Sequence, residues 1–330
     1  MMQYRDLGNS GIKISAVGLG TWAIGGGPWW GSSDDDQSIK TIHAALDNGI
    51  NLVDTAPVYG YGHSESVVGK ALKDRRDRAV LATKCGLWWD SRIGAHHFDY
   101  DGRSVYRSLN PATLTIELEH SLKRLQTDCI DLLQTHWQSV EPAKTPIEDT
   151  MAWLMQMKDE GKIRAVGVSN ITCSEMDEYL AAGELASNQP RYSMLDRSIE
   201  DEVLPYCIRH NIAVLAYSPL EQGLLTGKIG MDYKLSETAV RNRIAWFKSE
   251  NRIKVVELVR GWGILAEKYD CSVAQLVIAW TIAQPGLTCA LCGARRVDNI
   301  VENAGAGSLH LDKSDMQKMR SDVEALGMPA

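Results

Sequence analysis

Residues 129–169 read CIDLLQTHWQSVEPAKTPIEDTMAWLMQMKDEGKIRAVGVS, and two short apolar runs in this stretch enclose a segment of helical length. The runs at 129–136 and 164–169 are rich in Val, Ile and Leu and have the length of buried strands. Between them, the Thr, Pro and Glu within 145–148 predict a capping box and a first-turn proline, followed by a helix over 147–160. A strand, a helix and a second strand in this order form a βαβ unit with parallel strands.

The same alternation continues along the whole chain. Strands are expected at 17–21, 51–56, 79–85, 129–136, 164–169, 186–190, 212–218 and 288–293. Helices are expected near 35–48, 64–73, 112–125, 147–160, 174–182, 200–210, 250–269, 272–284, 297–304 and 313–326. Eight strand–helix units in roughly 300 residues have the size of a closed barrel. The sequence therefore predicts an α/β fold, a (β/α)8 TIM barrel.

Three further segments complete this prediction. Residues 4–15 alternate polar and apolar side chains around a Gly-Asn pair and predict a β-hairpin that caps the bottom of the barrel. The long connections 86–110 and 219–249 follow the third and seventh strands, so we expect them as loops on the active face. No linker-like segment divides residues 1–330, which favours a single domain.

The composition is that of a soluble globular protein, with 44% hydrophobic residues and a formal net charge of −7. This mildly acidic balance argues against nucleic-acid binding, which usually needs a basic face. No apolar run approaches the roughly 18 residues that span a membrane, and residues 1–6 show no signal-peptide pattern. Seven scattered cysteines predict a reduced, cytoplasmic setting. Cys289 and Cys292 lie in a predicted strand and are expected in the core rather than on a metal.

Polar side chains stand at the ends of three consecutive predicted strands. Asp54, Lys84 and His136 end the second, third and fourth strands. Strand parity places Asp54 on the same face as Leu52, and His136 on the same face as Gln134. If these faces point inward, the polar groups meet at the mouth of the barrel, together with Tyr59.

These four side chains suit the protonation of a carbonyl oxygen. A Tyr59 hydroxyl can donate a proton, and a buried Lys84 ammonium beside it is expected to lower its pKa. Asp54 would hold the ammonium, and His136 could donate or accept at the substrate oxygen. Each residue alone also has an ordinary structural explanation, but three of them at neighbouring strand ends, together with Tyr59 five residues after Asp54, favour a catalytic site.

The stretches around these residues resemble the motifs of the aldo-keto reductase superfamily. The matching segments are LVDTAPVYG at 52–60, LATK at 81–84, SLKRLQTD at 121–128, DLLQTHW at 131–137 and GKIRAVGVSN at 161–170. TKCG at 83–86 and THWQSV at 135–140 are most similar to a bacterial branch that includes an NADH-dependent methylglyoxal reductase. The resemblance implies hydride transfer between a nicotinamide nucleotide and a small aldehyde, ketone or alcohol, with no metal.

The resemblance also implies roles for individual residues. Tyr59 would be the general acid and base, Lys84 and Asp54 would tune it, and His136 would orient the carbonyl. Nucleotide-binding positions would be Gly20, Thr21, Trp22, Ser169, Asn170, Gln189, Tyr217, Ser218, Pro219, Leu220, Gln222, Gly223, Gly293, Ala294, Arg295, Arg296, Asn299, Glu302 and Asn303.

Two adjacent arginines bear on the choice of nucleotide. Arg295 and Arg296 fall in the segment that the resemblance assigns to the adenosine end. A guanidinium fork pairs well with the oxygens of a 2′-phosphate. The pair therefore favours NADP(H), with NAD(H) as the alternative, and loss of Arg295 is expected to abolish the preference.

The aromatic composition is unusual, because the chain has ten Trp and only two Phe. Several Trp fall at predicted strand ends or in active-face loops, and the expected substrate-pocket residues are Trp22, Trp30, Trp88, Trp89 and Trp137. Indole supplies a flat apolar wall and an N–H donor. Sugar-like carbonyls or polyols are therefore favoured, and α-dicarbonyls also fit.

Other enzyme classes fit less well. The G-x-G-x-x-A match at 18–23 lacks the helix that a Rossmann site needs, because Gly-Gly-Gly-Pro follows at 25–28. No Tyr has a Lys four positions later, which argues against a short-chain dehydrogenase. A metal enzyme would need more ligands than Asp54 and His136, and His96–His97 is expected in a loop.

A binding module is the remaining alternative. The β subunits of potassium channels resemble these reductases, so a non-catalytic NADPH-binding regulatory subunit stays open. The expected partner is a small-molecule carbonyl or alcohol, with no nucleic acid and no membrane. The sequence does not indicate the oligomeric state.

Overall fold

Eight parallel strands close into a barrel in the computed structural model, which describes all 330 residues. Each strand pairs with the barrel strand before it and after it along the chain, and the last pairs with the first. The barrel strands are β3 (Val17–Gly20), β4 (Leu52–Asp54), β5 (Val80–Cys85), β9 (Ile130–Thr135), β10 (Ile163–Ser169), β11 (Ser187–Gln189), β12 (Ala213–Tyr217) and β13 (Leu287–Gly293). They coincide with the eight predicted runs, so the (β/α)8 barrel is confirmed.

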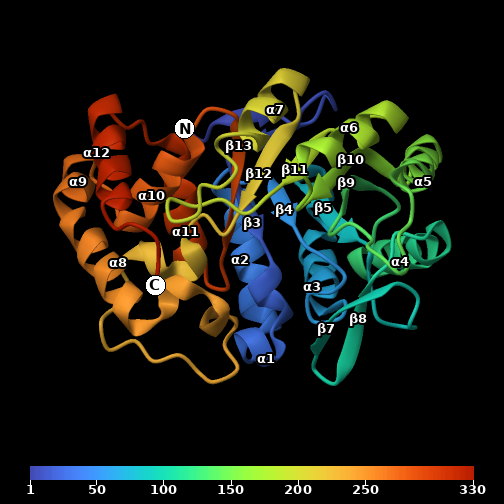
Figure 1. Ribbon diagram of the computed structural model, residues 1–330, viewed down its shortest axis with the longest axis horizontal. Coiled ribbons are helices and arrows are strands. Elements are labelled where there is room, and N and C mark those ends of the chain that lie inside the picture. The colour runs from blue at the N-terminus through green and yellow to red at the C-terminus, as the bar shows by residue number, and fades with distance from the viewer.

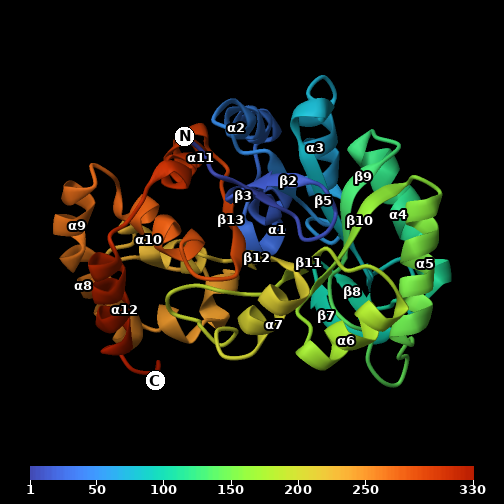
Figure 2. The same cartoon turned by 90° about the horizontal axis from the view of Figure 1, so that it is seen from above.

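Helices cover the outside of the barrel, as Figures 1 and 2 show from two directions, except for the short α1, which lies at the cavity end. They are α1 (Gly27–Trp30), α2 (Asp35–Asp47), α3 (His63–Leu72), α4 (Pro111–Leu125), α5 (Ile147–Asp159), α6 (Cys173–Ala182), α7 (Val203–His210), α8 (Ser249–Gly261), α9 (Gly263–Lys268), α10 (Val273–Ile282), α11 (Val297–Gly305) and α12 (Lys313–Glu324). No helix combines the length and the apolar character that crossing a membrane requires.

One predicted helix is divided. The pattern over 250–269 predicted a continuous helix, but α8 ends at Gly261 and α9 begins at Gly263. Glycine lowers helix propensity, and two glycines here flank a single residue. That residue, Trp262, is 1% exposed, and its indole N–H donates to Asp322 at 3.0 Å. Burial of the indole at the break offsets the interruption of the backbone ladder.

Side chains cap the starts of two helices, α4 and α6, and the cap predicted for α5 is absent. The Asn110 side chain accepts from the Ala112 amide, with a proline in the first turn of α4. Thr172 and Glu175 form a reciprocal capping box on α6. The box predicted at Thr145 is wrong, because α5 begins at Ile147 with no side-chain cap. Thr145 instead exchanges hydrogen bonds with the Ser139 hydroxyl, through its own amide and carbonyl.

The N-terminal hairpin closes one end of the barrel, as predicted. Strands β1 (Tyr4–Asp6) and β2 (Lys13–Ser15) pair antiparallel. Leu7, Ile12 and Ile14 of this hairpin form one buried cluster with the inward side chains of the strands, namely Leu52, Val80, Ala82, Leu132, Ala165, Ala186, Ala213, Leu215, Cys289 and Leu291. In Figure 1 the hairpin lies at the opposite end from α1 and the β7–β8 hairpin. Cys289 and Cys292 are buried free thiols, in agreement with the sequence.

The first long connection is a small sheet rather than a loop. Strands β6 (Leu87–Trp88), β7 (Ala95–Tyr100) and β8 (Arg103–Arg107) pair antiparallel in the order β6-β8-β7. His96 and His97 therefore lie on a strand, which corrects the loop expectation. The overlooked signal is Asp101-Gly102, a two-residue hairpin turn with positive φ of 49° and 76°. The second connection, 219–249, contains three short 3-10 helices.

A buried carboxyl group on α4 anchors the start of this small sheet. Glu117 accepts the Gly86 amide at 2.7 Å with one oxygen, and its other oxygen has no partner. Burial raises the pKa of Glu117 from 4.5 to about 8. The folded chain therefore holds a proton that the unfolded chain releases, and stability declines as pH rises between these two values.

We expect Glu117→Gln to remove this pH dependence. Relative to the wild type, the variant should gain stability from pH 5 to pH 8, by about 1.4 kcal/mol for each pH unit at most. Urea unfolding at both pH values measures the difference. A constant difference between the two proteins at both pH values would contradict the assignment.

Candidate active site

Three of the predicted catalytic side chains are in direct contact at the carboxyl ends of β4 and β5. The Lys84 ammonium donates to Asp54 Oδ1 at 2.5 Å, to the Thr55 carbonyl at 3.0 Å and to the Tyr59 hydroxyl at 3.3 Å. Lys84 is 1% exposed and Asp54 is 3% exposed, whereas Tyr59 borders the open cavity. The lysine thus stands behind the tyrosine and is shielded from solvent by it.

His136 completes the group from the end of β9. Its ring lies edge-on to the Tyr59 ring, with centroids 5.8 Å apart and planes at 82°. Its amide donates to the Cys85 carbonyl at 2.9 Å, which fixes the backbone beside β5. The strand parity expected from the sequence is therefore correct, because Leu52, Val80, Ala82 and Leu132 face the barrel interior below the four polar groups.

Burial dominates the protonation states of the site. Burial raises the pKa of Tyr59 above its usual value, although the Lys84 ammonium acts in the opposite direction. Lys84 has the expected lowering effect on the Tyr59 pKa, but the loss of hydration outweighs it, and Asp54 partly cancels the lysine charge. Burial opposes the Lys84 charge, but Asp54 and Tyr59 raise its pKa on balance. Burial, Lys84 and His97 lower the pKa of His136 well below its usual value. Near neutral pH, Tyr59 therefore faces the cavity as a protonated phenol and His136 as a neutral imidazole.

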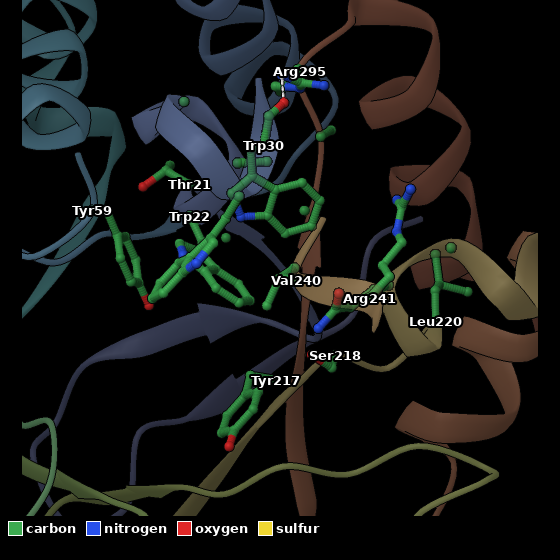
Figure 3. A pocket seen from close by; sticks show the side chains of 18 of the residues that line it. Thr21, Trp22, Trp30, Tyr59, Tyr217, Ser218, Leu220, Val240, Arg241 and Arg295 are labelled. Carbon is green, nitrogen blue, oxygen red and sulfur yellow. Dashed lines mark hydrogen bonds between the residues drawn. The ribbon is translucent and has the colours of Figure 1, made fainter. Parts of the chain in front are cut away.

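A cavity of about 1110 Å³ opens above these residues (Figure 3). Pockets for one small ligand usually have roughly 300–1,000 Å³, so this cavity has room for a large ligand or for two. It is bordered by Asp54, Tyr59 and His136 and by every predicted nucleotide position, namely Gly20, Thr21, Trp22, Ser169, Asn170, Gln189, Tyr217, Ser218, Pro219, Leu220, Gln222, Gly223, Gly293, Ala294, Arg295, Arg296, Asn299, Glu302 and Asn303.

Hydrogen bonds order the polar groups at the end of the cavity near His136. Asn170, with φ of 57°, donates its amide to Ser169 Oγ at 2.9 Å and to the His136 carbonyl at 3.2 Å. The Tyr217 hydroxyl donates to the Asn170 amide oxygen at 2.9 Å. Ser169 in turn donates to the backbone carbonyl of Gln189 at 2.6 Å. These bonds fix the orientation of the Asn170 amide, whose two N–H groups and oxygen all have partners within the chain.

The middle of the cavity is suited to an anionic, extended ligand. Ser218, Glu221, Gln222 and Gly223 all have positive φ, of 59°, 47°, 51° and 100°, and form a tight turn at the cavity wall. Such turns present backbone N–H groups to anions. The Gln222 amide oxygen is buried without a partner. The turn therefore offers backbone donors and one side-chain acceptor to an extended ligand.

Arg241 is the residue here that sequence reasoning did not assign to the site. Its guanidinium lies within 6 Å of the Trp30, Tyr233 and Phe247 rings, and its Nε is buried without a partner. Figure 3 shows Arg241 reaching across the cavity beside Leu220. The sequence did contain a signal for Arg241, because it is a basic residue that lies among aromatic residues in the long connection after the seventh strand. Arg241 adds positive charge next to the Ser218–Gly223 turn.

The two predicted arginines have different surroundings. Arg295 donates to the Trp30 carbonyl at 3.0 Å and to the Ser32 carbonyl at 3.1 Å, and Figure 3 shows it beside Trp30. Arg296 is 69% exposed and pairs with Asp298 at 2.7 Å. Arg295 therefore holds the end of α1, whereas Arg296 can exchange a surface partner for a ligand.

The predicted tryptophan wall is only partly correct. Trp22, Trp30 and Trp137 border the cavity, and Trp29 joins them. Trp88 and Trp89 do not. On β6 alternate side chains face opposite ways, so Leu87 reaches the cavity and Trp88 points away, donating to Ser91 at 2.7 Å. Trp89 packs on Tyr61 at 5.2 Å. Phe98 and Tyr100, from the sheet that the sequence did not predict, complete the wall.

Comparison with known proteins gives consistent matches over nearly the whole chain. Residues 16–324 match the profile described as "Aldo/keto reductase family". The chain is 45% identical to the NADH-specific methylglyoxal reductase of Escherichia coli (strain K12) over 98% of this chain and 99% of the relative. It is 40% identical to aldo-keto reductase YhdN of Bacillus subtilis (strain 168), over 98% and 94% of the two chains.

Solved structures of two oxidoreductases are also similar to this chain over nearly its whole length. The glycerol dehydrogenase AKR11B4 from Gluconobacter oxydans has a TM-score of 0.87 and 39% identity, with 99% of this chain and 96% of that chain covered. An aldo-keto reductase from Klebsiella pneumoniae in complex with NADPH has a TM-score of 0.73 and 27% identity, with 97% and 95% covered.

Proposed function

The chain belongs to the aldo/keto reductase family, and from this premise we propose that it reduces small aldehydes or ketones with NADP(H), using Tyr59 as the general acid. Carbonyl oxidoreduction with a nicotinamide nucleotide follows from the family and from the named oxidoreductases among its relatives. The assignment of Tyr59 rests on one observation, the contact of Lys84 with both Tyr59 and Asp54 at the floor of the cavity.

The residues of this chain would act on the substrate oxygen. The bound nucleotide supplies the hydride that reaches the carbonyl carbon. Tyr59 donates its proton to the carbonyl oxygen, and Lys84 stabilises the phenolate that remains. Asp54 keeps Lys84 charged within the barrel. The neutral His136 donates a hydrogen bond that orients the carbonyl before transfer. In the reverse direction Tyr59 accepts the proton from an alcohol.

The nucleotide would lie along the cavity from His136 to α11. Ser169, Asn170 and Gln189 would hold the nicotinamide amide, and Tyr217 would stack on the ring. The Ser218–Gly223 turn and Arg241 would hold the pyrophosphate. Arg296 and Asn299 would bind at the adenosine end, beside Glu302, which pairs with Lys228 at 2.5 Å.

The walls favour a compact, hydroxylated substrate. Trp22, Trp29, Trp30 and Trp137 offer flat faces, and the Trp30 indole N–H is buried without a partner. An unpaired donor beside an apolar face favours a ligand that has both a carbon skeleton and oxygen acceptors. Sugar-like carbonyls, α-dicarbonyls and, in reverse, polyols are the proposed substrates. The relatives named for methylglyoxal and glycerol act on members of these classes.

A carbonyl panel tests the proposed function. Purified protein is mixed with NADPH and with methylglyoxal, glyceraldehyde, keto sugars or a simple aliphatic aldehyde, and the nicotinamide absorbance is followed. We expect turnover, with the highest kcat/KM on a hydroxylated or dicarbonyl substrate. Tight nucleotide binding without turnover on any carbonyl would instead favour a regulatory binding module.

The arginine pair gives a prediction about nucleotide choice. We expect kcat/KM for NADPH to exceed that for NADH by more than about tenfold, since charge-assisted hydrogen bonds contribute about 1.5–3 kcal/mol each. Arg296→Ala should remove most of this ratio by lowering the NADPH value alone. Arg295→Ala should lower both values together, because that side chain holds α1 rather than the phosphate. Equal use of both nucleotides by the wild type would refute the preference.

A further inference from the structure

Three buried side chains inside the barrel form a closed ring of hydrogen bonds. Gln134 Nε2 donates to Asp54 Oδ2 at 3.0 Å. Gln189 Nε2 donates to the same oxygen at 2.9 Å and to Gln134 Oε1 at 3.1 Å. Gln134 is fully buried and does not border the cavity, whereas Asp54 and Gln189 do. Gln134 therefore links the carboxylate beside Lys84 to the amide at the nicotinamide end.

The ring determines how the Gln189 amide is turned. An amide group carries two N–H donors and one carbonyl acceptor, and both donors of Gln189 are used by Asp54 and Gln134. Its Oε1 accepts no hydrogen bond from the chain, although the residue borders the cavity. The Gln189 side chain therefore presents a hydrogen-bond acceptor, its Oε1 atom, to the cavity. Rotating the amide by 180° would set its oxygen against the Asp54 carboxylate, which is unfavourable.

Only a glutamine meets both requirements at position 134. It donates to Asp54 and accepts from Gln189 at once. A glutamate would place a second carboxylate against Asp54, and an aliphatic residue would leave both partners short of a hydrogen bond. The fold also makes room for this side chain. A Cβ added at Gly167 on β10 would lie 2.9 Å from Gln134 Cγ and 2.5 Å from Ser187 Oγ.

We propose that Gln134 is a positioning residue that holds the Gln189 carbonyl oxygen toward the cavity, and so selects for the N–H group of a nicotinamide carboxamide. The proposal rests on the proposed function for the kind of ligand that occupies the cavity. It adds a residue that touches neither nucleotide nor substrate, and it couples nicotinamide orientation to the Asp54–Lys84 pair.

Gln134→Met tests this with two ligands that differ only in the nicotinamide. The methionine keeps the volume and removes both hydrogen bonds. Titrations of tryptophan fluorescence with NADP+ and with 2′-phospho-ADP-ribose, which lacks nicotinamide, give the two Kd values. We expect the NADP+ Kd to rise about tenfold and the 2′-phospho-ADP-ribose Kd to change less than twofold. The same split is expected between NAD+ and ADP-ribose.

Two controls separate positioning from general disturbance. Gln138→Met removes another buried glutamine, which bonds Tyr179 at 3.1 Å away from the cavity wall, and it should leave both Kd values unchanged. Gln189→Met should weaken NADP+ binding, and adding Gln134→Met to it should have no further effect, because the two residues act in series.

Several results would overturn the inference. These are equal weakening of both ligands in Gln134→Met, no weakening of either, or additive losses in the double variant. Failure of the proposed function would show differently, as a wild type that reduces no carbonyl in the panel. The ligand pair tests Gln134 in either case, because it measures binding rather than turnover.

Discussion

Tyr59→Phe is expected to lower kcat for carbonyl reduction by at least about 10²-fold, up to about 10⁴-fold, and to leave the Kd for NADPH unchanged. Phenylalanine keeps the ring that packs near Trp22 and His136, with centroids 6.2 Å and 5.8 Å away. It removes the only hydroxyl that contacts Lys84. The ammonium retains Asp54 and the Thr55 carbonyl as partners, so the barrel interior should stay intact.

Single-turnover kinetics with excess enzyme measure this effect on the chemical step. The pH dependence offers a second check. Since the Tyr59 pKa is raised, wild-type reduction should fall only on the alkaline side, as the phenol loses its proton, and the reverse oxidation should rise there. In Tyr59→Phe, neither the alkaline fall in the reduction rate nor the alkaline rise in the oxidation rate should be seen. A kcat near that of the wild type would show that another group delivers the proton.

Lys84→Met is expected to cost both activity and stability. The lysine is 1% exposed, and its removal leaves Asp54 Oδ1 without a cationic partner inside the barrel. Breaking a buried ion pair from one side costs about 3–5 kcal/mol. The Tyr59 phenolate also loses the charge that would stabilise it, so kcat should fall by about 10²-fold or more. Urea unfolding and steady-state kinetics on the same preparation measure the two losses.

The double variant Lys84→Met/Asp54→Asn separates these losses. Neutralising the carboxylate removes the unpaired charge, and the carbonyl oxygen of the new amide can still accept from Gln134 and Gln189. Stability should therefore largely return, whereas kcat should stay low. Lys162→Met serves as the matched surface control, since its pairs with Glu119 and Glu160 are exposed and such pairs contribute about 0–1 kcal/mol. Recovery of activity in the double variant would mean that Lys84 has only a structural role.

Much of the fold could be read from local pattern. Runs containing Val, Ile or Leu gave seven of the barrel strands, and the strand–helix alternation gave the eighth at 186–190, which has none of these residues. The parity of 52–54 and 134–136 placed Asp54 and His136 on the inner face. These features depend on short-range geometry, because side chains alternate along any strand. The sheet formed by β6, β7 and β8 was not predicted from the sequence. Strands β7 and β8 mix polar and aromatic side chains and lack a run of Val, Ile and Leu, and only Asp101-Gly102 marks the turn between them.

The sequence alone was enough to determine the barrel, the strand ends that carry Asp54, Lys84 and His136, and many of the segments that line the cavity, although not Arg241, Phe98 or Tyr100. Only the tertiary structure decided how strongly each group is buried, and therefore that the Tyr59 pKa rises despite Lys84. It also decided which end of the Gln189 amide faces the cavity, through an Asp54 that lies 135 residues away in the chain. Desolvation and hydrogen-bond partnership depend on neighbours from distant segments, and local periodicity carries no information about them.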